Sequence, residues 1–195
     1  MHYVMSSLVL VFTFVISPIA VAQIVDPDIS ISASGLPNQF GLDFANSSTL
    51  FEVTPSSTNG FADVTFASTD LGVGRRWFDA ELGQSFSCAT IDNFQIIGSN
   101  EGGVPAGSVE VPLGSDFYLA INTGDFDLNG EPLFDQLGWA QLNVDQNLNL
   151  SAVDGALSLS CEGIIIGVPE PELGMMAMFL FASFITLTRR TRRSD

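Results

Sequence analysis

An acidic loop between residues 125 and 136 is the most ligand-like feature of this chain. Its oxygen-bearing side chains occupy positions 1, 3 and 5 of a calcium-loop pattern, and Gly130 occupies position 6. Position 12 is Gln136 where a calcium loop has Glu, and no helical pattern flanks the loop. Calcium is therefore the candidate cofactor, and a plain acidic hairpin turn at Asn129-Gly130 is the alternative. The candidate ligands are Asp125, Asp127, Asn129, Glu131 and Asp135.

Carboxylate chemistry is the kind of catalysis that the sequence leaves open. His2 is the only histidine, it lies in a segment expected to be removed, and the chain has no lysine. This argues against Ser-His-Asp and Cys-His catalysis, histidine metal sites and Schiff bases. Asp79 and Glu81 would share a strand face, as a glycoside hydrolase pair could. Nineteen acids between residues 23 and 168 make such a pair expected by chance, so we expect no enzymatic activity and no catalytic residue.

Arginine beside aromatic residues offers a possible sugar-binding surface. Arg75-Arg76-Trp77-Phe78 is the basic spot of the exported part, and such groups stack on sugar rings or pair with carboxylated polysaccharide. The alternative is that the arginines offset neighbouring acids while Trp77 and Phe78 alternate across a strand. Trp139 lies in a clear strand pattern, which favours a core position over a sugar platform.

Two cysteines, Cys88 and Cys161, lie in the part expected to be exported. Outside the cytoplasm a disulfide is the usual state of such a pair. The alternative is two buried thiols. A bridge would tie the middle of the domain to its last strands.

Charge excludes one class of partner. The chain has 195 residues, 22 acidic and 6 basic side chains, and a net charge of −16. Residues 23 to 168 carry a net charge of −17, because they hold only two arginines. Nucleic acid is therefore excluded as a partner, since phosphate binding needs clustered cations.

Short runs of alternating polarity predict strands through residues 23–167, and no run in this region has a convincing helical stripe. Gly- and Asn-rich turn signals separate them. We therefore expect an all-β domain, an antiparallel, jelly-roll-like sandwich. The clearest runs are Phe61–Phe66, Ser108–Val111, Asp116–Ile121, Leu137–Val144 and Ala156–Ser160. The turn signals are Asn59-Gly60, Glu101-Gly102-Gly103, Asn129-Gly130 and Asp154-Gly155.

Residues 1–22 have the pattern of a secretory signal peptide. An apolar run, Leu8 to Ile16, precedes Ser17-Pro18 and an Ala20-x-Ala22 site, so cleavage is expected before Gln23. An N-terminal membrane anchor or a buried strand is the alternative, although the run is short for a bilayer.

Residues 168–195 form a second sorting element. Val168-Pro169-Glu170-Pro171 precedes an uncharged stretch, residues 173–188, which is just long enough for a thin bilayer. The tail 189–195 holds four arginines, which predicts that it stays cytoplasmic while the acidic body lies outside. They are Arg189, Arg190, Arg192 and Arg193.

This order of motif, short apolar helix and arginine cluster resembles the PEP-CTERM sorting domain of Gram-negative bacteria. The resemblance implies recognition by an exosortase, processing near the Pro-Glu-Pro motif, and a producer that makes exopolysaccharide. Glu172 departs from the small hydroxyl residue that is common there, which bears on cleavage and not on membrane insertion. A plain C-terminal tail anchor is the alternative.

The region from Phe117 to Gly167 is similar to the bodies of exported PEP-CTERM proteins of no assigned activity. The resemblance lies in Phe117-Tyr118-Leu119-Ala120, in a Gly138-Trp139 strand and in Gly163-Ile164-Ile165-Ile166-Gly167 before the sorting motif. It implies a sandwich and no particular reaction.

Together these features predict an exported, non-enzymatic, structural protein. It would be held transiently in the inner membrane with its body outside the cytoplasm, and would then reach the cell surface or extracellular matrix. A carbohydrate-binding module for exopolysaccharide is the first alternative, and a carboxylate-based glycoside hydrolase is the second.

Overall fold

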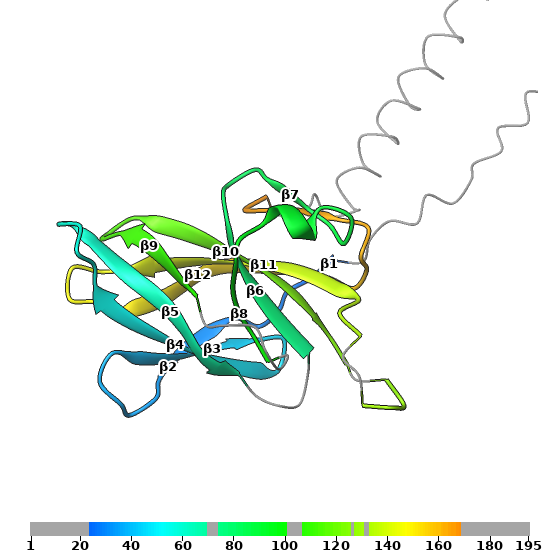
Figure 1. Ribbon diagram of the computed structural model, residues 1–195, viewed down its shortest axis with the longest axis horizontal. Helices are drawn as coiled ribbons and strands as arrows, with labels where there is room; N and C mark the ends of the chain where they lie inside the picture. Colours follow the sequence, from blue (N-terminus) through cyan, green and yellow to red (C-terminus); the bar gives the residue numbers. More distant parts are fainter. Residues whose placement is uncertain (1–23, 70–73, 101–106, 126, 131–132, 169–195) are drawn as a thin grey trace, which may run out of the picture.

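The computed structural model describes residues 24–69, 74–100, 107–125, 127–130 and 133–168. These residues form antiparallel β-sheets that face each other as two layers, with no α-helix among them (Figure 1). The predicted all-β, sandwich-like class is thus confirmed. The signal segment, the apolar stretch 173–188 and the arginine tail lie outside the described residues.

The first layer is a six-stranded sheet, and its central strands β10, β11 and β12 form a meander of neighbouring hairpins. Gly138 of β11 pairs with Ile121 of β10, which sets the register of the central pair. In spatial order the strands are β1 (Ile24–Val25), β12 (Leu150–Ser158), β11 (Gln136–Val144), β10 (Asp116–Gly124), β6 (Gly74–Ala80) and β8 (Ile96–Ser99).

The second layer is a five-stranded sheet that is also mostly a meander. Its strands, in spatial order, are β2 (Ser30–Ala33), β3 (Gln39–Phe44), β4 (Ser47–Pro55), β5 (Phe61–Thr69) and β9 (Ser108–Pro112). This order differs from the jelly-roll-like one expected from the sequence. Two Greek keys would separate consecutive strands, whereas here short turns join consecutive strands into adjacent hairpins.

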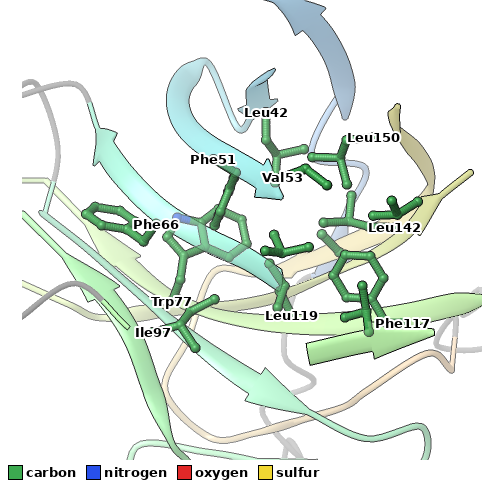
Figure 2. Packing of buried hydrophobic residues seen from close by; sticks show 14 of the residues in the cluster. Leu42, Phe51, Val53, Phe66, Trp77, Ile97, Phe117, Leu119, Leu142 and Leu150 are labelled. Carbon is green, nitrogen blue, oxygen red and sulfur yellow. The ribbon is translucent and has the colours of Figure 1, made fainter. Parts of the chain in front are cut away.

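The main core lies between the two layers. Along β4 the buried positions alternate, so that Phe51 and Val53 face inward, and Figure 2 shows them meeting Trp77 and Leu119 from the opposite sheet. The edge of Trp77 packs on Phe51 with ring centroids 5.6 Å apart. Aromatic pairs in this geometry add to the stabilisation from burial itself.

A small cap covers part of the other face of the six-stranded sheet. It consists of β7 (Ser85–Phe86), the 3₁₀ turn η1 (Ile91–Asn93) and β13 (Ile164–Ile165), where Ile164 pairs with Phe86. A second cluster of buried residues, including Phe86 and Trp139, fills the space beneath it. The six-stranded sheet is therefore buried on both faces where the cap lies, and Figure 1 shows β7 at the top, on the side of this sheet away from β3 and β4.

Most predicted strands are present, and one predicted turn is wrong. The runs that begin at Phe61, Ser108, Asp116 and Leu137 fall in β5, β9, β10 and β11. Asp154-Gly155 does not turn the chain, because it lies inside β12 and Gly155 pairs with Ala140. A Cβ on Gly155 would lie 3.0 Å from the Trp139 carbonyl oxygen, so this glycine permits close packing of strands.

Candidate functional site

The cap is closed by a disulfide between Cys88 and Cys161, as the sequence predicts. Their Cα atoms lie 5.3 Å apart, and the bridge spans 73 positions of the chain. The Cys88 backbone N–H also donates to the Cys161 carbonyl at 3.3 Å. The bridge joins the loop after β7 to the segment before β13, so it fixes the end of the described chain to the body.

The chain leaves the cap through a short, well-bonded segment. The Ile166 N–H donates to the Gln84 carbonyl, the Gly83 N–H donates to the Ile166 carbonyl, and both distances are 2.9 Å. Ile164 and Ile166 point into the core beneath the cap, whereas Ile165 is exposed. Val168, the first residue of the predicted sorting motif, is therefore held close to the body. The rest of that motif lies outside the described residues.

The acidic loop that was the calcium candidate is organised by its own hydrogen bonds. The Asp127 carboxylate accepts from the Asn129 backbone N–H at 2.8 Å and from the Asn129 side-chain amide at 3.1 Å. Gly130 has a φ of 81°, and its N–H donates to the Asp127 carbonyl at 3.0 Å. Asn129-Gly130 thus forms the predicted turn.

The described carboxylates among the calcium candidates do not form a metal-binding group. Nowhere in the described ranges do three His, Cys, Asp or Glu side chains come together as a metal-binding group. Glu131 lies outside those ranges. Calcium at this loop therefore stays a prediction.

The candidate carboxylate pair lies at the end of β6. Asp79 is half-buried, and burial raises the pKa of its carboxyl, with a smaller contribution from the charge of Glu81 and an opposing one from a backbone hydrogen bond at Ala80. Glu81 follows the strand and is exposed. A raised pKa suits a general acid, but structural carboxyls also show one. The polar pocket described below is lined by neither residue.

The basic spot contributes to the core and does not form an exposed sugar platform. Arg75 is 1% exposed, and its guanidinium donates to the carbonyls of Phe44 and Ala45 at the end of β3. Trp77 is fully buried, and its Nε1–H donates to the Thr49 hydroxyl at 3.1 Å. Arg76 lies over the Phe134 ring at 4.0 Å, which uses its cation–π capacity within the chain. Trp77 and Phe78 alternate across β6, as the structural alternative predicted, since they belong to the buried clusters on opposite faces of the sheet. The printed contacts of the arginines are with backbone carbonyls and an aromatic ring, so charge compensation of neighbouring acids stays a prediction.

Trp139 is a core residue, as predicted. It is 1% exposed and packs against Tyr118 with ring centroids 6.2 Å apart. Among the described residues its Nε1–H has no hydrogen-bond partner. Both tryptophans of the chain are therefore unavailable as surface platforms for sugars.

A carboxylate held by two amides lies on the exposed face of the six-stranded sheet, and sequence reasoning missed it. Asp116 accepts from the Gln141 amide at 2.7 Å and from the Asn143 amide at 2.9 Å. Asp116 is in β10 and the two amides are in β11, where Asp116 pairs with Asn143. The sequence signal that could have indicated this group is the pair of polar residues at alternating positions of β11. Such groups can exchange their mutual hydrogen bonds for those of a polar ligand.

A polar pocket of about 320 Å³ lies beside the hairpin that joins β3 and β4. Its carboxylates, Asp28 and Asp43, come from different segments, and the Ser30 hydroxyl donates to Asp43 at 3.4 Å. The sequence carries no motif for it, because the register of three strands brings its lining together. The lining residues are Asp28, Ser30, Asp43, Asn46, Ser47 and Ser48.

No family model matches this chain, and neither the curated proteins nor the solved structures include a match to it. In the part of the chain that the structure describes, no helix is long and apolar enough to cross a membrane. The function must therefore be argued from the residues and the geometry above.

Proposed function

We propose that this chain is an exported structural protein without enzymatic activity. Its β body is held at the outer side of the inner membrane by the sorting sequence of residues 168–195, and then reaches the cell surface or extracellular matrix. The observation that carries the proposal is the Cys88–Cys161 bridge directly before the sorting motif. Disulfides persist in oxidising compartments, so the bridge supports export.

The position of the bridge also suits a tethered domain. Only six residues separate Cys161 from Val168, and β13 pairs with β7 in between. A pull on the C-terminal segment would therefore act on a covalently closed cap and not on a fraying strand. Recognition by an exosortase and association with exopolysaccharide belong to this proposal through the resemblance of residues 168–195.

The test is the processing of the chain in an exosortase-containing, exopolysaccharide-producing bacterium. We expect mature protein to begin at Gln23, to lack the arginine tail and to occur in the surface or matrix fraction. Intact-mass measurement after cell fractionation reads all three. A matched control replaces Glu170 with Gln, because it alters the sorting motif and leaves the body unchanged. Mature material that keeps Met1 or the arginine cluster would contradict the proposal.

A carbohydrate-binding module is the second candidate, and the amide-held carboxylate at Asp116 favours it. Sugar hydroxyls both donate and accept, so they fit a carboxylate flanked by the Gln141 and Asn143 amides. A glycan array with residues 23–168 tests it, with Asp116→Ala as the site variant and Asp63→Ala on β5 as the charge-matched control. Binding that both variants retain would reject this site. Release of reducing ends from any bound glycan would instead support the hydrolase alternative.

A further inference from the structure

Three large apolar side chains are exposed where the described chain leaves the cap. They are Leu82, Ile165 and Val168, with exposed fractions of 62%, 45% and 40%. We call this set the exit patch. Leu82 contacts Gly167, since a Cβ placed there would lie 2.4 Å from a Leu82 methyl carbon, and the Val168 N–H donates to the Ile165 carbonyl at 3.3 Å. The exit patch therefore consists of two residues of the short stretch 165–168 and of Leu82, which contacts that stretch at Gly167.

The exit patch is rigid in spite of its exposure. Ile165 of β13 points outward, because the residues on either side of it, Ile164 and Ile166, are buried beneath the cap. Leu82 lies in the turn after β6, which the two hydrogen bonds between residues 83–84 and Ile166 hold in place. Conformational entropy therefore opposes docking of this surface less than it would oppose docking of a flexible loop.

Chain length places the exit patch beside the bilayer if residues 173–188 cross it, so the inference rests on the proposed function. Four residues, 169–172, separate Val168 from that apolar stretch. Val168 and residue 173 are thus five Cα–Cα steps apart, which span about 18 Å at most when fully extended. The polar headgroup layer is roughly 5–8 Å thick on each side of a hydrocarbon core of about 30 Å. Val168 therefore cannot move far from the headgroup region.

We propose that the exit patch rests on the membrane, with Leu82, Ile165 and Val168 inserted at the boundary of headgroups and acyl chains. Three partly exposed side chains would bind a bilayer weakly on their own. The tether makes the contact intramolecular, which raises the effective concentration of the bilayer for this surface. Exposed Glu81 directly precedes Leu82, and exposed Glu162 stands three positions before Ile165. These negative charges near the exit patch suit zwitterionic lipid better than anionic lipid.

The test uses the chain from Gln23 to Asp195 reconstituted in phosphatidylcholine vesicles, with and without bromine on the acyl chains. Trp77 and Trp139 are buried, so a new tryptophan at the surface supplies the signal. Leu82→Trp reports on the exit patch. Leu36→Trp is the matched control, because Leu36 is 61% exposed and belongs to the β2–β3 connection of the other layer. We expect brominated lipid to reduce the added emission of Leu82→Trp at least twofold and to leave that of Leu36→Trp unchanged.

Vesicle flotation separates this inference from the membrane anchoring on which it rests. Chain that floats with the vesicles while Leu82→Trp escapes quenching would overturn the docking and leave the anchoring intact. Chain that does not float would overturn both. Equal quenching at both positions would indicate unspecific adsorption and reject the exit patch. Shielding of Leu82→Trp from aqueous acrylamide without quenching by brominated lipid would mean that a second copy or a processing protease covers it, which also overturns the proposal.

Discussion

Asp79 shows how a single carboxyl links burial to pH. Its pKa is raised mainly by burial, so the folded state holds the proton more tightly than the unfolded chain does. Between the ordinary value of 3.8 and the raised folded value, the unfolded chain loses the proton first. The free energy of unfolding therefore falls as pH rises through this window.

We expect Asp79→Asn to be more stable than the wild type at pH 7, because the amide removes the charge that burial penalises. The difference should shrink at pH 3, where the carboxyl is protonated in both states. Urea denaturation at the two pH values measures it. Glu81→Gln should act in the same direction by a smaller amount, since its charge is the lesser cause. A less stable Asp79→Asn at pH 7 would contradict this account.

The two tryptophans differ in how their N–H groups are satisfied. Trp77 donates to Thr49 in the core, whereas Trp139 has no hydrogen-bond partner among the described residues. We expect Thr49→Val to cost about 1–3 kcal/mol, because the substitution keeps the shape and leaves a buried donor unsatisfied. Trp139→Phe is the companion variant. It should lower the free energy of unfolding by less than the same substitution of a tryptophan whose N–H is hydrogen-bonded, such as Trp77. Chemical denaturation reads both, and a neutral Thr49→Val would show that Trp77 finds another acceptor.

The β3–β4 hairpin places two residues in the left-handed region. Ala45 has a φ of 49° and Asn46 a φ of 60°, and a two-residue turn of type I′ requires positive φ at both positions. Asn tolerates this conformation and Ala does not. Ala45→Gly should therefore stabilise the protein by about 1 kcal/mol. Thermal melting measures it, with Ala33→Gly in strand β2 as the control that should destabilise. A lower melting temperature for Ala45→Gly would mean that the Ala45 methyl group matters more to the core than the turn strain does.

The loop between β10 and β11 carries the calcium prediction. The Asp127 carboxylate accepts two hydrogen bonds from Asn129. These hydrogen bonds compete with a cation for the carboxylate oxygens of Asp127. A cage without a bidentate Glu should bind at about 10⁻⁴–10⁻³ M. Millimolar calcium should then raise the melting temperature by a few degrees, magnesium should do less, and Asp127→Ala should abolish the calcium-specific part. An equal rise with magnesium would identify the loop as an acidic turn whose charge is merely screened.

The molecule as a whole consists of two sheets and a cap that the disulfide joins to the chain end. The bridge closes a loop of 73 positions, and in the chain-entropy model this contributes about 4 kcal/mol by restricting the unfolded state. Replacing both cysteines with serine should lower the free energy of unfolding by about that amount. Guanidinium denaturation measures the change, and reduction of the wild type is the matching control. A double variant as stable as the oxidised wild type would mean that the packing of Ile164 and Ile166 alone secures the cap.

The all-β class, the main strands and the cysteine pairing follow from local pattern and composition. Alternation along Asp116–Ile121 and Leu137–Val144 reflects a half-buried sheet wherever it occurs, and Asn59-Gly60 and Asn129-Gly130 favour turns by their own backbone preferences. The cysteines could be paired because only two are present and the predicted export signal would place them in an oxidising compartment. Each of these features depends on residues that are neighbours in sequence or on the number of cysteines in the chain.

Tertiary packing decided the rest. The Ala45-Asn46 turn carries weak turn chemistry and exists because β3 and β4 must pair, while Asp154-Gly155 carries strong turn chemistry and lies in a strand because β12 packs closely on β11. Arg75 looks like a surface cation in sequence and is buried, because β6 lies inside the six-stranded sheet and the Arg75 guanidinium reaches the carbonyl of Phe44 in the other sheet. The polar pocket, the Asp116 cluster and the exit patch depend likewise on residues far apart in the chain. Local patterns mark individual polar or apolar positions, but they do not encode which positions meet, because strand register and the docking of the cap bring them together.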